Sequence, residues 1–336
     1  MSLKKFLIGT SVALIVFSTL QLWAQSAVQV EAKVSSQLKK EAVEYLSACG
    51  NFIRFDDENV YTGFGTYWTG NHQPRQPQPN ILRFVPIQKL TEFQVDTLDS
   101  VIDVVKYKQL NYVLTYSGIE EWDLKNFKRL NQYKTHILNR PLGDEEHPQA
   151  FALYQNKLII AHGRLGVSFF DLDTKQITRA YAVAQGQYPL QSVVKGISVS
   201  GRYAYAVLDS YTLVDQHEKP AFRGIAVIDM ENENTVAELD GMDPGADSVI
   251  SDDRVAIVSF YGQPLWKYSV SSLQSSKLPQ PLKRVWKFPV EGHPTGKAAI
   301  DTENYYTCYS KMPEPGQGPY FIKVPMVLNR KVLFLD

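Results

Sequence analysis

Short runs of apolar and β-branched residues recur along the chain, and each is opened by a Gly, Asn or Pro that breaks the preceding element. The clearest runs are 118–124, 166–172 and 224–230, and the pattern is looser at 80–85 and 264–270. The copies are spaced by ~40–60 residues, as expected when one supersecondary unit is repeated. Several short strands in such a repeat predict an all-β fold, a β-propeller.

A second repeated element lies between these runs and fixes the boundaries of the units. Gly-to-Pro segments occur at 143–148, 186–189, 241–244 and 292–294, and 96–102 resembles 243–250. Gly and Pro at such positions favour turns between strands. Aligning both markers gives six four-stranded units at about 49–95, 96–138, 147–184, 192–239, 243–290 and 293–336. In the fourth, we predict strands at 192–200, 202–208, 224–230 and 235–239.

Composition agrees with β-structure, because 12% of the residues are aromatic, with 19 Tyr and 16 Phe, and aromatic side chains favour strands. The sequence offers no linker at which to divide residues 49–336, so we predict one propeller domain. Residues 27–48 are predicted to form an N-terminal extension with a short helix, capped by Ser35 or Ser36 and presenting Leu38, Ala42, Tyr45 and Leu46 on one face. If residues 27–48 instead contribute a strand, the propeller has seven blades.

The N-terminus has the pattern of a secretory signal peptide. A basic start at residues 1–5 precedes an apolar stretch, and small residues at 24–26 predict cleavage after Ser26. The mature chain is then exported, periplasmic or secreted, without a membrane span. The alternative is an uncleaved anchor, since 6–23 is close to the ~18-residue minimum for spanning. Lys plus Arg equals Asp plus Glu, at 35 each, so no overall field attracts nucleic acid.

The two cysteines, Cys49 and Cys308, lie in the first and last predicted units. A closed ring brings those units together, and exported proteins keep disulfides. We therefore expect a Cys49–Cys308 disulfide that closes the propeller; the alternative is two buried thiols.

Motifs of known chemistry are absent from the sequence: there is no nucleophile elbow, metalloprotease, haem-attachment, phosphate-binding or dinucleotide-binding pattern. Segment 224–230, preceded by 202–207 and followed by 235–239, resembles the repeats of bacterial exported LVIVD-type and YVTN-type (YncE-like) propellers, most closely over residues 110–240. The resemblance implies an exported propeller architecture and transfers no catalytic residue.

Insertions indicate which end of the ring is used, because they concentrate in the loops after the second strand of a unit, at 68–79, 209–222 and 311–318. Loops on a rigid scaffold are where binding residues gather. With the turns between units, they give one candidate binding face: Trp68, Arg75, His147, Asp209, Tyr211, Asp243 and His293.

We expect this face to bind a protein, peptide or glycan without cofactor or catalysis. The alternatives are a metal-dependent hydrolase or lactonase, in which His147, Asp243 and His293 hold a divalent ion, and the propeller subunit of a periplasmic dehydrogenase.

Overall fold

The computed structural model describes residues 35, 37–47, 50–65, 79–136, 141–143, 146–181, 192–210, 224–240, 246–251, 255–260, 263–269, 292–294, 299–300, 304–311 and 320–327. From residue 246 onward the description is of backbone pairing, with Tyr306 as the exception.

The described strands form six antiparallel sheets, each built from strands that are consecutive in the chain. The first sheet holds β1 (Arg54–Phe55), β2 (Asn59–Gly63), β3 (Ile81–Pro86) and β4 (Phe93–Asp96). The second holds β5 (Val101–Tyr107), β6 (Leu110–Thr115), β7 (Ile119–Asp123) and β8 (Lys128–Tyr133). The third holds β9 (Ala150–Tyr154), β10 (Lys157–Ala161), β11 (Val167–Asp171) and β12 (Gln176–Tyr181).

The fourth sheet holds β13 (Ser192–Ser200), β14 (Tyr203–Ser210), β15 (Gly224–Asp229) and β16 (Asn234–Asp240). The fifth holds β17 (Ala246–Ser251), β18 (Val255–Phe260) and β19 (Gln263–Ser269). In the sixth, β22 (Asn304–Lys311) pairs with β23 (Tyr320–Val327) on one side and with β20 (Gly292–Pro294) and β21 (Ala299–Ile300) on the other.

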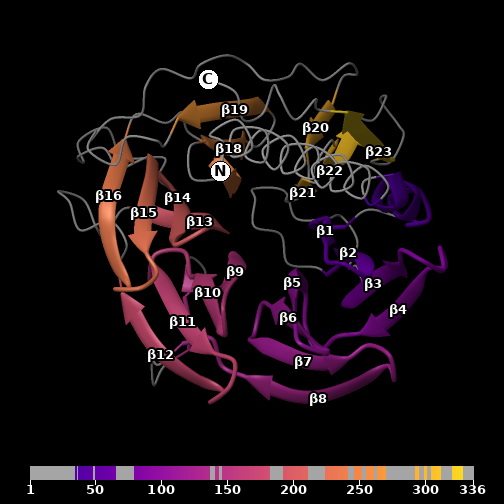
Figure 1. Ribbon diagram of the computed structural model, residues 1–336, viewed down its shortest axis with the longest axis horizontal. Helices are drawn as coiled ribbons and strands as arrows, with labels where there is room; N and C mark the ends of the chain where they lie inside the picture. The colour runs from indigo at the N-terminus through magenta and orange to yellow at the C-terminus, as the bar shows by residue number, and fades with distance from the viewer. Residues whose placement is uncertain are drawn as a thin grey trace, which may run out of the picture.

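These sheets are arranged around a common centre (Figure 1), with β5, β9 and β13 nearest the centre and β8, β12 and β16 on the perimeter. The repeated apolar runs of the sequence are β3, β7, β11, β15 and β19, the third strand of each of the first five sheets. The predicted strand at 192–200 coincides with β13, and the other three of that unit agree within two residues.

The apolar core lies between neighbouring sheets and explains why the inner strands are apolar on both faces. In β10, Leu158 and Ile160 join a buried cluster with the second sheet, whereas Ile159 and Ala161 join a cluster with the fourth. Successive residues of a strand point to opposite faces, so a strand between two sheets buries both. Leu158, Ile159, Ile160 and Ala161 are all fully buried.

The helix prediction is partly wrong. Residues 37–44 are helical, and Leu46 packs with the first sheet and with Tyr306 of the sixth. Tyr45 was expected on the buried face but is 53% exposed, and Val43 is buried instead. The helix ends before the predicted residue 48, and its last turn is tightened by the hydrogen bond from Tyr45 N to Ala42 O. Tyr45 follows Val43 by two residues, and at 3.6 residues per turn this places the two side chains on opposite faces of the helix.

The prediction of a turn at 292–294 is also wrong, because these residues form β20 and pair with β22, with His293 opposite Ser310. Pro has no N–H to donate to a neighbouring strand, so within sheets it is tolerated in edge strands. Here Gly-His-Pro forms the short first strand of the sixth sheet. The Gly-to-Pro segments at 186–189 and 241–244 lie outside the described residues.

One turn is built in the same way in three sheets. At the end of β7, β11 and β15, an Asp carboxylate accepts the backbone N–H groups of the following residues, as Asp171 does from Asp173 and Thr174. Asp123 and Asp229 make the equivalent contacts with Lys125 and Glu231. Asp side chains stabilise turns in this manner. The recurring Asp of the repeat therefore fixes the turn between the third and fourth strands.

The fourth residue after this Asp has a left-handed backbone: φ is 54° at Phe127, 61° at Lys175 and 52° at Glu233. Each of these side chains reaches the preceding sheet. The ring of Phe127 lies 5.6 Å from that of Phe93, Lys175 bonds Glu121, and Glu233 accepts a hydrogen bond from Lys157. The turn thus joins consecutive sheets as well as consecutive strands.

Candidate functional site

The ring of sheets has two ends, and the described connections between strands fall into two groups accordingly. One end we call the loop face. Its described residues lie in five connections: 64–65 with 79–80, 97–100, 116–118, 134–136 with 141–143 and 146–149, and 162–166. The opposite end, the turn face, comprises the connections 56–58, 87–92, 108–109, 124–127, 155–156, 172–175, 201–202 and 230–233. Antiparallel strands place these connections alternately at the two ends.

Of the candidate binding residues, the structure describes His147 and Asp209 with their side chains and His293 by its backbone in β20. His147 lies between β8 and β9, at the loop face, and Asp209 lies near the end of β14 that faces the same way. The remaining candidates lie outside the described residues: Trp68, Arg75, Tyr211 and Asp243.

His147 is held by the neighbouring connection of the second sheet. Its ring stacks on that of Tyr116, with centroids 3.6 Å apart and planes inclined by 15°. Its Nδ1 lies 3.2 Å from the carbonyl oxygen of Tyr116, a distance at which a protonated Nδ1 donates. Both rings are half-buried. His147 therefore fastens the loop before β9 to the turn after β6, a role that the sequence pattern did not indicate.

His162 follows β10 and is fully buried. Its Nδ1 lies 3.3 Å from the carbonyl oxygen of Glu146. Burial lowers the pKa of His162 to about 4, because a charged ring is poorly solvated there; the nearby His136 and His147 add to the shift, and backbone hydrogen bonds with Glu146 and Thr135 oppose it. The ring is thus neutral at neutral pH and belongs to the core.

Asp209 is only 6% exposed and pairs in register with Val193 of β13. The sequence analysis named it as part of the candidate binding face, whereas in the structure it lies among buried strand residues. Among the residues that the structure describes, no group of three or more His, Cys, Asp or Glu side chains is placed to hold a metal ion. In the same part of the chain, no helix is long and apolar enough to cross a bilayer.

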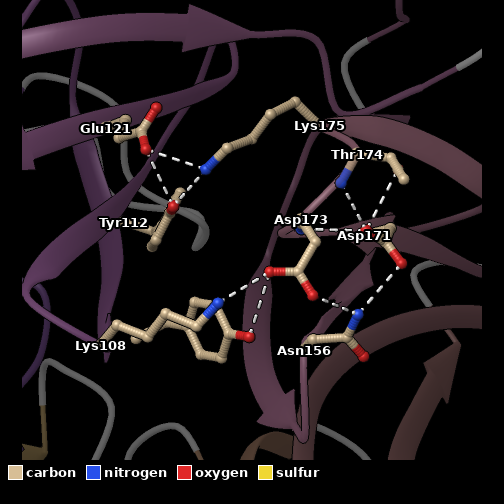
Figure 2. A network of polar contacts seen from close by, with 9 residues as sticks. Lys108, Tyr112, Glu121, Asn156, Asp171, Asp173, Thr174 and Lys175 are labelled. Carbon is tan, nitrogen blue, oxygen red and sulfur yellow. Dashed lines mark hydrogen bonds and ion pairs between the residues drawn. The ribbon is translucent and has the colours of Figure 1, made fainter.

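A polar network on the turn face joins the second and third sheets (Figure 2). Lys175 donates to the hydroxyl of Tyr112 and to Glu121 Oε1, the latter at 2.8 Å. Tyr112 also donates to Glu121, at 2.9 Å. Lys108 and Asp173 form a second, outer pair at 3.0 Å. Figure 2 shows the inner and outer pairs side by side, extending from the third sheet to the second.

The carboxylate of the inner pair is buried, and that of the outer pair is not. The side chain of Glu121 is 5% exposed, whereas that of Asp173 is 49% exposed. Burial alone would raise the pKa of Glu121, but hydrogen bonds from Lys175, Tyr133, Asn131 and Tyr112 outweigh it and lower the pKa to about 2. The carboxylate is therefore ionised at any physiological pH, and both of its oxygens accept hydrogen bonds from side chains of the fold.

Comparison with solved structures identifies the fold. The β-propeller domain of Cps50 (Swd1) from Myceliophteria thermophila superposes with a TM-score of 0.55 at 9% sequence identity, covering 83% of this chain and 88% of that one. The structure of U3-55K gives a TM-score of 0.53 at 9% identity, covering 84% and 83%. A chain of the mitotic checkpoint complex gives 0.52 at 11% identity, covering 81% and 73%.

The chain is a β-propeller. At these identities the likeness establishes the architecture alone. No family model and no curated protein sequence matches the chain.

Proposed function

We propose that this protein is an exported, non-enzymatic β-propeller with six blades that binds a protein, peptide or glycan partner through its loop face. The observation that carries the proposal is the state of three titratable groups that the structure describes at that end. His147 is stacked on Tyr116, His162 is buried and neutral, and Asp209 is buried. General acid–base catalysis needs a titratable group within hydrogen-bond reach of a substrate, and these three groups are committed to the fold.

A binding role is supported by the contrast between the two ends of the propeller. On the turn face, the residue four positions after the strand-ending Asp contacts the preceding blade in three successive sheets, so these side chains hold neighbouring blades together. The loop face breaks the repeat, and the sequence places its longest insertions there. A rigid scaffold with variable loops at one end is the usual arrangement of a binding site. The loop face also carries Leu98, which is 49% exposed.

In-cell photo-crosslinking tests the proposal. A photoreactive residue at Leu98, on the loop face, should capture one discrete partner, and the double substitution Trp68→Ala with Arg75→Ala should remove that product without changing the melting temperature. The matched control is the same photoreactive residue at Tyr45, which is 53% exposed but lies on the N-terminal segment. Equal products from both positions, or a partner retained by the double variant, would argue against binding at the loop face.

A second experiment separates binding from metal chemistry. If the loop face holds a divalent ion, protein purified without chelator should contain stoichiometric metal by elemental analysis, and His147→Ala should remove it. Export is tested separately, by locating the mature chain and sequencing its N-terminus, which we expect to be Ala27.

A further inference from the structure

Two rim segments occupy equivalent positions in the second and fourth sheets and carry opposite charge. The basic rim segment, residues 125–132, contains Lys125, Lys128 and Arg129 and no acid. The acidic rim segment, residues 231–238, contains Glu231, Glu233 and Glu238 and no base. Each begins two residues after the Asp that ends the third strand and runs into the outermost strand, β8 or β16. The whole chain has a net charge of zero, so this separation is local.

Exposed apolar side chains gather on the same two segments. The large hydrophobic residues that stand exposed in the described part of the chain are Tyr45, Leu98, Phe127, Leu130 and Val236. Phe127 is 50% and Leu130 39% exposed on the basic rim segment, and Val236 is 46% exposed on the acidic one. Exposed apolar residues that lie together and are surrounded by polar groups mark sites of protein contact, and Phe127 and Leu130 lie three residues apart on the basic rim segment.

Leu130 and Val236 are also equivalent by backbone geometry. The pairing of β8 with β7 skips Leu130, because Trp122 faces Arg129 and Glu121 faces Asn131. The pairing of β16 with β15 skips Val236 in the same way, since Ile228 faces Thr235 and Val227 faces Ala237. Such bulges interrupt the edge of a sheet and oppose direct strand pairing. A contact at either rim is therefore made by side chains.

Three of the rim charges remain accessible for a contact between molecules: Lys125, Lys128 and Glu231. Glu233 and Arg129 are paired within the chain, with Lys157 and Glu120 respectively. Glu231 accepts a hydrogen bond from Arg202 at 2.9 Å, and its side chain is still 58% exposed. Lys125 donates to Gln109 at 3.3 Å, and Lys125 and Lys128 are both exposed. An exposed carboxylate can accept from a second cation, since it offers about four lone-pair sites.

We propose that the basic rim segment of one molecule binds the acidic rim segment of a second copy. The binding partner is a second copy because the chain itself displays both complementary surfaces, each with an exposed aliphatic residue at the bulge. The two segments lie on different sheets, on separate parts of the perimeter (Figure 1), so one molecule can use both at once. The contact is then head-to-tail, and head-to-tail contacts give open chains or closed rings.

Sedimentation velocity of the purified mature protein tests this proposal. The weight-average mass should rise with protein concentration beyond that of a dimer at low salt. It should fall towards the monomer as salt is raised to about 1 M, where charges are screened beyond ~3 Å. Replacing Leu130 or Val236 by Ser should weaken the association at low salt, since both residues are exposed and neither supports the core.

Charge reversal on the two rim segments gives the decisive test of the proposal. In the variant Lys125→Glu with Lys128→Glu both rims are acidic, and in Glu231→Lys with Glu238→Lys both are basic; each should remain monomeric alone. Mixed in equal amounts, the two variants should associate as the wild type does. The matched control, Lys89→Glu with Lys108→Glu, makes the same charge change at exposed sites outside both rim segments and should associate normally.

A wild type that stays monomeric at low salt, or variants that associate alone but not better when mixed, would overturn the proposal. Equal melting temperatures confirm that both variants are folded. The inference is independent of the loop face, so its failure would leave the proposed function standing.

Discussion

Replacing Lys175 by Gly should destabilise the propeller, although the substitution relieves backbone strain. The φ angle of Lys175 is 61°, a left-handed conformation that costs a residue with a side chain about 1–2 kcal/mol and costs Gly nothing. If the Lys175 side chain only caps its own turn, the Gly variant should be the more stable protein. The sign of the change therefore decides whether this side chain holds the two blades together.

The opposing contribution comes from Glu121. Removing one partner of a buried ion pair costs about 3–5 kcal/mol, and this carboxylate, 5% exposed, keeps its hydrogen bonds from Tyr112, Tyr133 and Asn131. We therefore take the lower end of that range. After subtracting the relieved strain, the net loss is about 1–2 kcal/mol.

Lys108→Gly is the matched control. Lys108 also has a left-handed backbone, with φ of 57°, and is also ion-paired, but the side chain of its partner Asp173 is 49% exposed. Exposed pairs contribute little because water competes for both charges. This variant should therefore keep or raise the melting temperature, while Lys175→Gly should lower it by several degrees.

Thermal unfolding followed by circular dichroism at one scan rate measures both. The carboxyl of Glu121 has a folded pKa of about 2, below its ordinary value of 4.5, so its contribution is present above pH 4.5 and is lost as the pH falls towards 2. Lys175→Gly should reduce this acid dependence. A Lys175→Gly protein at least as stable as the wild type would refute the reasoning.

Three further outcomes are expected. The pKa of His162 is about 4 in the fold and 6.5 ordinarily, so roughly 3 kcal/mol of stability should be present above pH 6.5 and lost as the pH falls to 4. His162→Asn should make the free energy of unfolding, measured by denaturant titration at several pH values, depend less on pH in this range. Arg54→Ala should lower stability by about 3 kcal/mol or more in urea unfolding, because Asp103 is fully buried and accepts from Arg54 at 2.8 Å; Arg54→Lys should recover only part of the loss. Mass spectrometry of exported protein should find Cys49 joined to Cys308, and two thiols that alkylate without reductant would contradict the bridge.

The first and last sheets of the ring lie against each other, which the predicted Cys49–Cys308 disulfide requires. Tyr306 of β22 meets Phe55 of β1 edge-on, with ring centroids 5.0 Å apart, so the first and last sheets are neighbours. The sequence predicted this proximity from ring closure alone. Cys49 lies outside the described residues, and for Cys308 only the backbone in β22 is described, so the disulfide stays a prediction.

Local patterns determined the strands. The repeated apolar runs, the Gly that opens them and the Asp that ends β7, β11 and β15 are properties of a few consecutive residues, and the bounds of these strands agree with the sequence within two residues. The repeat was visible, but the role of the Asp was not. The available signal was an Asn or Thr three residues later, at Asn126, Thr174 and Asn232, whose side chains hydrogen-bond the carboxylate.

Contacts between sheets were decided only by the tertiary structure. Nothing in the sequence around Glu121 marks it as the partner of Lys175, 54 residues away, because pairing across two blades depends on their relative position. For the same reason the sequence named Asp209 and His147 as candidate binding residues, whereas in the structure Asp209 is buried and His147 stacks on Tyr116. Strand periodicity is encoded locally, whereas the burial and charge state of a side chain depend on which other strand the fold brings against it.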